Sequence, residues 1–297
     1  MRWCLRRIIR KLWLITTEHL KAGLWFRDEE DFKVGMNFVA LQAHASRVVV
    51  LSFILMSNHV HFVVKADSKK DAEAFIEGFK HRYSLYLRYK YGVKEFLRGN
   101  DVQVDLISPY DEDPEKAIAY VEMNCVAAGI CSHPSQYPWG TGGVFFNSRK
   151  PAGRPVGSFS KRACKRLLHT DIESLPENWL VGDDGYILPQ NYVDVAAVEA
   201  FFRTPQRMNW FLANSSKAKK RLGADDNLPA FRDQVILSAV PDLCRSLFGK
   251  PDFSRLSREE QVEFVRQLRF RFSAHVNQIA RVCGLTYEQA AQLMDSV

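Results

Sequence analysis

The sequence lacks the features that mark secreted and membrane-embedded proteins. Its six cysteines are scattered along 297 residues, and no two of them form a C-x-x-C pair. A disulfide framework or a zinc site built from thiolates is therefore not expected. No apolar run is long enough to cross a bilayer, and no cleavage site of small residues follows the basic N-terminus. These absences predict a cytoplasmic protein without a membrane partner.

The composition is that of an ordinary globular protein. Hydrophobic residues make up 46% of the sequence, which is enough for a substantial core, and the length favours two domains over one. The formal net charge is +7 and the isoelectric point is about 9.1. A moderate basic excess favours polyanionic partners such as nucleic acid but does not identify one.

The first half of the chain alternates between strand and helix patterns. Apolar strand patterns cover 11–17, 47–56, 59–64 and 101–107, and helical patterns cover 28–46 and 70–90. The order strand, helix, strand, strand, helix, strand predicts a ferredoxin-like α+β fold, an antiparallel sheet with helices on one side. The other face of such a sheet is available for ligands.

Composition also divides the chain into three parts. Residues 1–148 form the predicted ferredoxin-like domain, which ends in a stretch rich in Ser, Pro, Gly, Arg and Lys. Residues 149–250 are predicted to be a mixed, mostly helical region without a chemical motif. Residues 251–297 are predicted to be a segment similar to a helix-turn-helix.

The prediction for the last segment rests on two capping boxes. Ser257-x-x-Glu260 and Thr286-x-x-Gln289 mark helix starts, and a helix between them ends at a glycine turn. Helix, glycine turn and capped helix is the pattern of a helix-turn-helix, whose second helix enters the DNA major groove. Thr286, Tyr287 and Gln289 are the candidate contacts to duplex DNA.

Two histidines begin the strand at 59–64. Because side chains alternate along a strand, His59 and His61 project from the same face and Val60 from the other. Two neighbouring imidazoles can share a metal ion. A histidine pair without a ligand is the alternative unless a third ligand and a nucleophile lie nearby.

The helix that begins at Asp113-Pro114-Glu115 offers both groups. Asp113 is expected as the N-cap, with proline at the first helical position. Tyr120 and Asn124 lie one turn apart on one face, whereas Glu122 points nearly the opposite way. If that face meets the histidine strand, the asparagine completes a set of three ligands and the tyrosine lies beside the metal.

Four motifs in register carry a resemblance to a known family. They are Leu55-Met56-Ser57-Asn58-His59-Val60-His61, Phe79-Lys80-His81-Arg82-Tyr83-Ser84, Tyr120-Val121-Glu122-Met123-Asn124-Cys125-Val126-Ala127-Ala128-Gly129 and Tyr137-Pro138-Trp139. Over roughly its first half the sequence resembles the HUH single-tyrosine transposases, especially the REP-associated tyrosine transposases.

The resemblance implies a nuclease core that acts on single-stranded DNA, often near hairpins. It implies that His59, His61 and Asn124 hold Mg²⁺ or Mn²⁺ and that Tyr120 is the nucleophile. Imidazole ligands alone would favour softer metals, so the identity of the metal depends on the resemblance. Members of the family commonly carry proline after the asparagine, and this chain has Cys125 there. We therefore expect the tyrosine helix to lack a proline kink.

Basic residues near these motifs are candidate DNA contacts. Lys80, Arg82 and Arg88 lie on the helix at 70–90, and Lys116 lies one turn before the tyrosine. The aromatic residues of the same helix follow a helical stripe, which is more typical of a core than of a surface on which bases stack.

The leading hypothesis is metal-dependent nicking and strand transfer of single-stranded DNA through a 5′-phosphotyrosine. The alternative is a domesticated, non-catalytic DNA-binding regulator that uses the C-terminal segment on duplex DNA. A metallo-hydrolase of another substrate class needs only the histidine pair and stays open as a third reading. The sequence leaves the oligomeric state open between monomer and homodimer.

Overall fold

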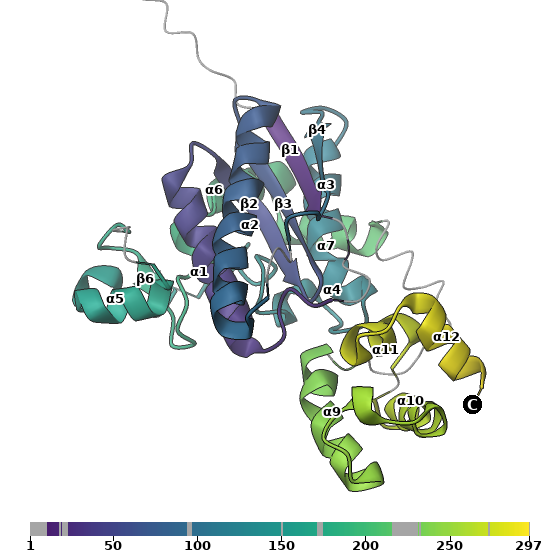
Figure 1. Ribbon diagram of the computed structural model, residues 1–297. Helices are drawn as coiled ribbons and strands as arrows, with labels where there is room; N and C mark the ends of the chain where they lie inside the picture. The colour runs from purple at the N-terminus through teal and green to yellow at the C-terminus, as the bar shows by residue number, and fades with distance from the viewer. Residues whose placement is uncertain are drawn as a thin grey trace, which may run out of the picture.

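The fold is a sheet-containing core joined to a separate group of C-terminal helices (Figure 1). The computed structural model describes residues 11–17, 19, 23–93, 97–149, 151–170, 175–215, 231, 233–272 and 274–296. All statements below concern these residues.

Four strands form the central sheet. They are β1 (Lys11–Thr17), β2 (Val49–Met56), β3 (His59–Ala66) and β4 (Val102–Ile107), in the order β2-β3-β1-β4. Each pair of neighbours is antiparallel. Together with α1 (Glu29–Ala45) and α2 (Lys69–Tyr91), this order is the predicted ferredoxin-like arrangement. The predicted fold class is confirmed.

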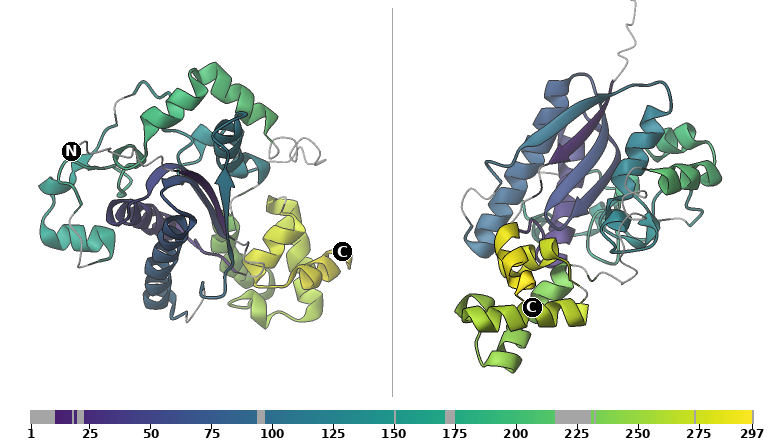
Figure 2. Two further views of the ribbon diagram at one scale, coloured as in Figure 1. Left: turned by 90° about the horizontal axis from the view of Figure 1, so that it is seen from above. Right: turned by 90° about the vertical axis from the view of Figure 1, so that its right-hand side faces the viewer.

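The two faces of the sheet are covered by different helices (Figure 2). The Phe62 ring of β3 packs edge-on against Phe75 and Phe79 of α2, which places α2 on one face. The next residue back along the strand, His61, contacts Tyr120 of α3 on the other face. Strand alternation therefore separates the apolar helix layer from the histidine face.

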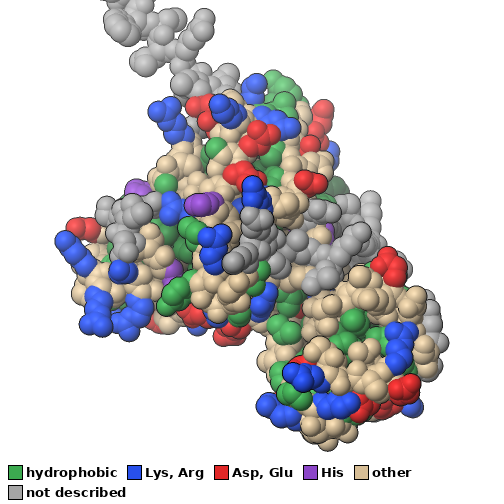
Figure 3. Space-filling model, viewed as in Figure 1, with side chains coloured by type: hydrophobic (Ala, Val, Ile, Leu, Met, Phe, Trp, Pro, Cys, Tyr) green, Lys and Arg blue, Asp and Glu red, His purple; other side chains and the backbone are tan. Residues whose placement is uncertain are grey.

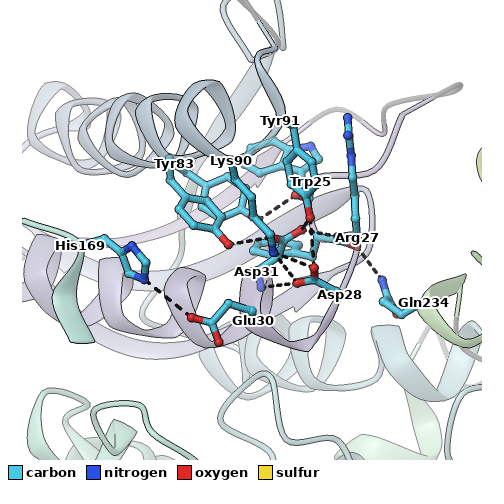
Figure 4. A network of polar contacts seen from close by, with 12 residues as sticks. Trp25, Arg27, Asp28, Glu30, Asp31, Tyr83, Lys90, Tyr91, His169 and Gln234 are labelled. Carbon is cyan, nitrogen blue, oxygen red and sulfur yellow. Dashed lines mark hydrogen bonds and ion pairs between the residues drawn. The ribbon is translucent and has the colours of Figure 1, made fainter. Parts of the chain in front are cut away.

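A polar network ties the start of α1 to the end of α2 (Figure 4). The Lys90 ammonium donates to both oxygens of Asp28, at 2.8 and 2.6 Å, and to Asp31 at 2.7 Å. Tyr91 donates to both carboxylates as well, and Asp28 caps α1 by accepting from the Asp31 N–H. Gly92 ends α2 in the left-handed region, at φ 68°. This network fixes the two helices relative to each other.

The tyrosine helix differs from the prediction at both ends. Helix α3 (Asp113–Glu122) has Glu112, at φ 61°, in the capping position with no side-chain cap bond, so the prediction of Asp113 as N-cap is wrong by one residue. The helix is also interrupted at Met123, and α4 (Asn124–Ala127) follows. The chain lacks the proline that the family commonly carries, and the helix is nevertheless broken at this point.

Two side chains satisfy the carbonyls exposed by this break. The Asn124 amide donates to the carbonyl oxygens of Tyr120, at 2.9 Å, and Val121, at 3.1 Å. The Cys125 thiol donates to the carbonyl of Glu122 at 3.4 Å. Side-chain donors that compete for backbone carbonyls favour helix ends, so the residues after Met123 themselves stabilise the break.

The Tyr-Pro-Trp motif closes the edge of the sheet beside β2. The carbonyl of Trp139 accepts from the Leu55 N–H at 2.8 Å, and the Tyr137 hydroxyl donates to the Leu55 carbonyl at 2.8 Å. Gly140 forms an antiparallel bridge with Ile54. This motif therefore pairs with an edge strand that would otherwise expose unpaired backbone groups.

The middle of the chain packs on the sheet core. Its regular elements are β5 (Arg154–Pro155), β6 (Leu180–Val181), α5 (Lys161–Leu168), α6 (Val195–Phe202) and α7 (Pro205–Asn214). The short 3₁₀ helices of the described chain are η1 (Pro134–Gln136), η2 (Val156–Ser158), η3 (Pro189–Asn191) and η4 (Phe253–Arg255). Buried side chains as far as Leu212 belong to one hydrophobic cluster with the sheet.

A second hydrophobic cluster begins at Ile236 and extends to Leu293. It is formed by α9 (Asp233–Phe248), α10 (Arg258–Phe272), α11 (Val276–Cys283) and α12 (Tyr287–Asp295). We call these helices the C-terminal unit. The packing therefore divides between 212 and 236, which does not coincide with the predicted limits at 148 and 250; the domain limits stay a prediction.

Asp233 joins the C-terminal unit to the sheet. Its buried carboxylate accepts from the Ser57 hydroxyl at 2.6 Å, in the turn between β2 and β3. It also accepts from Gln278 and from two nitrogens of Arg281, both on α11. Next to it, the Gln234 amide donates to the Phe26 carbonyl at 2.7 Å. One carboxylate thus holds together two helices of the C-terminal unit and the turn before the histidines.

Among the described residues, no helix has the length and apolar character needed to cross a membrane.

Candidate functional site

The two histidines lie at the start of β3, on the face of the sheet that α3 covers. His61 is fully buried and His59 is 5% exposed. Their ring centroids are 4.9 Å apart and the ring planes are nearly perpendicular, at 84°. The strand alternation expected from the sequence therefore brings the two imidazoles side by side.

Hydrogen bonds orient both rings through Nδ1. In His59 this atom lies 2.9 Å from Oδ1 of Asn58, and in His61 it lies 3.2 Å from Oγ1 of Thr16 in β1. Thr17, also in β1, exchanges hydrogen bonds with the backbone of Val60 between the histidines. Partners of this kind fix the orientation of a metal-binding imidazole, so a metal would be coordinated through Nε2.

Tyr120 of α3 lies beside the histidine pair, on the face of the sheet that α3 covers. Its ring lies edge-on to His61, with the centroids 5.6 Å apart at 84°. Burial raises the pKa of the half-buried Tyr120 phenol above its ordinary value, so the nucleophilic phenolate is harder to form than in water. The structure thus brings together three of the four predicted residues, namely both histidines and the tyrosine.

Asn124 is the fourth predicted residue, and it is buried one turn beyond the tyrosine. Its side-chain nitrogen is engaged with the carbonyls of Tyr120 and Val121. The amide oxygen is therefore the atom that would serve as a ligand. Carboxamide oxygen suits Mg²⁺ and Mn²⁺ better than it suits soft metals.

Glu122 points away from the histidines, as predicted. Its buried carboxyl accepts hydrogen bonds from Ser52 of β2 at 2.7 Å and from Thr141. Burial raises the pKa of Glu122 to about 7, although the bonds from Thr141 and Ser52 act in the opposite direction. This residue anchors α3 to the sheet and stands outside the candidate site.

Several residues of the site were not identified from the sequence. The His19 ring, just after β1, stacks on His59 with centroids 3.7 Å apart at 28°. Thr16 and Asn58 orient the imidazoles. Asn58 stands beside the histidines in the sequence, and this proximity was a usable signal. Thr16 and His19 become neighbours only through the pairing of β1 with β3.

Among the predicted DNA contacts, Lys80 lies in the protein interior. It is 5% exposed, and its ammonium donates to the Asn100 carbonyl at 2.7 Å and to Glu77 at 2.9 Å. This burial removes Lys80 from any surface that nucleic acid could contact, so its selection as a DNA contact is corrected. The aromatic stripe of α2 is core, as the sequence favoured.

The other predicted contacts lie nearer the surface. Arg88 is exposed, and Arg82 is half-buried, with Nε 3.4 Å from Oε1 of Gln42. Lys116 is exposed but donates to the Asp111 carbonyl at 2.6 Å and to Asp113 at 3.3 Å. The role of Lys116 at a phosphate stays a prediction. Its bonds to Asp111 and Asp113 compete with a phosphate for the ammonium group.

The predicted contacts of the last helix lie at the start of α12. Thr286, Tyr287 and Gln289 are exposed, and Thr286 and Gln289 form the predicted capping box. Gly284 ends α11 at φ 67°, which a glycine adopts without strain. The order of helix, glycine turn and capped helix is as predicted. The helix-turn-helix itself and its contact with DNA stay predictions.

The donor set fits an ion of the Mg²⁺ or Mn²⁺ class only if the asparagine takes part. Among the described residues, no group of three or more His, Cys, Asp and Glu side chains is placed to hold a metal. The candidate set is instead two imidazoles and one carboxamide. Its fit rests on the Nδ1 bonds, which orient both rings.

Comparison with known proteins gives a family match for the segment that contains the two histidines. Residues 26–102 match the family model described as "Transposase IS200 like". The histidine strand lies within an IS200-like transposase segment. The predicted resemblance is thereby confirmed for this segment, whereas Tyr120 and Asn124 lie beyond the matched residues.

Two solved structures show weak likeness to this chain. One, described as a REP-associated tyrosine transposase bound to a REP hairpin, is 14% identical, with a TM-score of 0.36 over 48% of this chain and 82% of that one. The other, a pyridine synthase from thiomuracin biosynthesis, is 14% identical, with a TM-score of 0.22 over 97% and 100% of the two chains. A search of curated proteins finds no match to the sequence. These similarities are too low to support an argument about function.

Proposed function

We propose that this chain nicks single-stranded DNA and transfers the cut strand through a covalent bond to Tyr120. The transposase-like segment supports a function of the transposase type. The observation that carries the finer proposal is the edge contact of Tyr120 with His61, beside a second oriented histidine. A nucleophile adjacent to a candidate metal site suits phosphoryl transfer.

The proposed reaction exchanges one phosphodiester for another. The Tyr120 oxygen loses its proton and bonds to phosphorus, and the bond from phosphorus to the 3′-oxygen breaks. That oxygen takes up a proton and leaves as a 3′-hydroxyl, while the 5′-phosphate stays on the tyrosine. Attack by a 3′-hydroxyl of another strand reverses the step, so the bond is conserved and not hydrolysed.

The residues of the site have distinct tasks in this proposal. His59, His61 and Asn124 would hold a divalent ion, which supplies charge to offset the scissile phosphate. Asn58 and Thr16 keep the imidazoles oriented. Burial raises the pKa of Tyr120, and a cation beside the phenol would act in the opposite direction by favouring the phenolate.

A covalent-adduct assay tests the nucleophile. We expect a labelled hairpin oligonucleotide with a single-stranded flank, incubated with the protein and Mn²⁺, to yield a complex that survives a denaturing gel. Tyr120→Phe should lose this adduct. Tyr110→Phe is the matched control, because Tyr110 lies shortly before the same helix and is 74% exposed. An undiminished adduct with Tyr120→Phe would refute the assignment.

A second candidate function is duplex DNA binding by the C-terminal unit without catalysis. The capped start of α12, with Tyr287 48% exposed, favours it. This function predicts sequence-selective binding of duplex DNA that persists in a His59→Ala and His61→Ala double variant. Duplex affinity that depended on the histidines and not on Tyr287 would contradict it.

A further inference from the structure

A short helix of the middle region carries four cations on one side. Lys161, Arg162, Lys165 and Arg166 of α5 are all exposed, and the helix contains no acidic residue. We call these four residues the α5 basic face. In the view of Figure 3, Lys and Arg side chains gather at the left edge of the molecule, where α5 lies.

The opposite side of α5 packs against the rest of the protein. At 3.6 residues per turn, the four cations share an arc of roughly 140°, and the apolar residues occupy the rest. Leu168 is buried, and the Leu167 carbonyl accepts from the Asn37 amide of α1 at 3.0 Å. The helix therefore packs on the core through its apolar side, and its charged side faces solvent.

This arrangement of charge disfavours the helix itself. The pairs Lys161 with Lys165 and Arg162 with Arg166 are like charges one turn apart, which destabilise a helix. Two of the cations also occupy the first turn, where the helix dipole favours acids. An anion bound from outside the helix would offset the repulsion between these like charges.

A fifth cation lies just before the helix. The exposed Arg154 guanidinium stacks over the Phe159 ring, 4.5 Å from its centroid. Stacking holds the planar guanidinium in place and leaves its edge to donate hydrogen bonds. Because Phe159 directly precedes the Ser160 cap of α5, this arginine extends the charged surface at the start of the helix.

We infer that the α5 basic face binds the phosphate backbone of nucleic acid at a distance from the cleavage site. The inference rests on the proposed function, which makes DNA the polyanion that this chain meets. An anionic membrane would require a free apolar face beside the charges, and on α5 that face packs against the core. Helix α5 lies against α1, whereas Tyr120 lies across the sheet from the helix layer. A strand that reaches both surfaces must pass around an edge of the sheet.

The location predicts a dependence on strand length. A single strand of about 12 nucleotides occupies one compact site, whereas one of about 40 nucleotides can span two surfaces. We expect Lys165→Gln/Arg166→Gln to weaken binding of the longer strand about tenfold. The slope of log affinity against log salt should fall by about 0.7 for each phosphate contact removed. Affinity for the shorter strand and the yield of its Tyr120 adduct should not change.

A matched pair controls for net charge. Lys69 and Lys70 are exposed at the start of α2, and Lys69→Gln/Lys70→Gln removes the same charge. Fluorescence anisotropy with labelled strands measures both variants, and circular dichroism checks that each is folded. Unchanged affinity for the longer strand in the α5 variant, or an equal loss in both variants, would overturn the inference. Tighter binding of anionic vesicles than of DNA, lost in the α5 variant, would also overturn it.

The outcome is separable from that of the adduct assay. Loss of long-strand binding with no adduct in the wild type would uphold the α5 basic face and refute the proposed nuclease. A tyrosine adduct with no effect of the α5 substitutions would uphold the proposed nuclease and refute the inference about the α5 basic face.

Discussion

The carboxylate of Asp233 provides the sharpest test of how the C-terminal unit is held. It is 4% exposed and accepts four hydrogen bonds, from Ser57 at 2.6 Å, from Gln278 at 3.0 Å and from Arg281 at 2.7 and 3.1 Å. The Arg281 side chain is itself only 16% exposed. Asp233→Ala leaves this guanidinium buried without its carboxylate, and such a loss costs about 3–5 kcal/mol.

The expected result is selective loosening of the C-terminal unit. Because α9, α11 and the Ser57 turn share this carboxylate, we expect α9 to α12 to lose amide protection while the sheet keeps it. With m-values of roughly 1–3 kcal/mol per molar urea, the urea midpoint of the C-terminal transition should fall by about 1 M or more. Hydrogen exchange read by mass spectrometry assigns the effect to these helices.

Two substitutions calibrate that result. Asp242 on the same helix pairs with Arg245, but both side chains are exposed, at 79% and 63%, so Asp242→Ala should cost about 0–1 kcal/mol. Ser57→Ala removes only the bond between the sheet and the C-terminal unit, at about 1 kcal/mol. If Asp233→Ala proved no more disruptive than Asp242→Ala, the reasoning from buried pairing would be refuted.

Two further predictions concern the close approach of Gly140 to β2 and the polar network at Asp28. Gly140→Ala would place a Cβ 2.8 Å from the Phe53 carbonyl oxygen, so it should destabilise the fold by about 1–3 kcal/mol, whereas Gly99→Ala meets nothing within 4 Å and should be neutral in thermal unfolding. Burial raises the pKa of Asp28, but the Lys90 bond and the Asp31 N–H outweigh it and hold the pKa below its ordinary value. Stability from this shift is complete above the ordinary value of 3.8 and is lost as the pH falls through the lower folded value. Lys90→Gln should therefore lower the urea midpoint at about pH 7. The additional decrease in that midpoint between about pH 7 and about pH 3 should be smaller than in the wild type. An unchanged dependence of the midpoint on pH would contradict this assignment.

The elements that the sequence predicted well are those with strong local signals. Continuous apolar residues predicted β2, and Gly284, in the left-handed region, ends α11 at the expected glycine turn. The Thr286 capping box formed as predicted. These features depend on neighbours in sequence, so periodicity and capping rules are sufficient to find them.

The errors arose where tertiary contacts override local preference. A lysine on the hydrophilic side of α2 was expected at the surface, but the Asn100 carbonyl binds Lys80 in a buried position. A break in the tyrosine helix was not expected from the sequence, which has Cys125 where the family commonly carries proline. The side chains of Asn124 and Cys125 stabilise the break without it, and helical spacing cannot reveal that interaction.

The candidate site shows the same limit. Strand alternation was enough to predict that His59 lies beside His61. The contact of Tyr120 with His61 depends on how α3 lies on the sheet, and Thr16 reaches His61 through the register of β1 with β3. Long-range register depends on the whole core and cannot be read from one segment.

The candidate site and the start of α12, which is the candidate contact to duplex DNA, are connected through the turn before β3. Asp233 binds Ser57, and the next residue, Asn58, orients His59. The Ser57 carbonyl also accepts from the N–H groups of Trp25 and Phe26, which lead into α1. A duplex held by α12 would therefore be anchored through a turn that also positions a candidate metal ligand. Because that turn is buried and hydrogen bonded on both sides, the distance from α12 to Tyr120 is set by the fold and not by a linker. A strand cut at the tyrosine would consequently lie at a fixed spacing from any duplex sequence that the C-terminal unit reads.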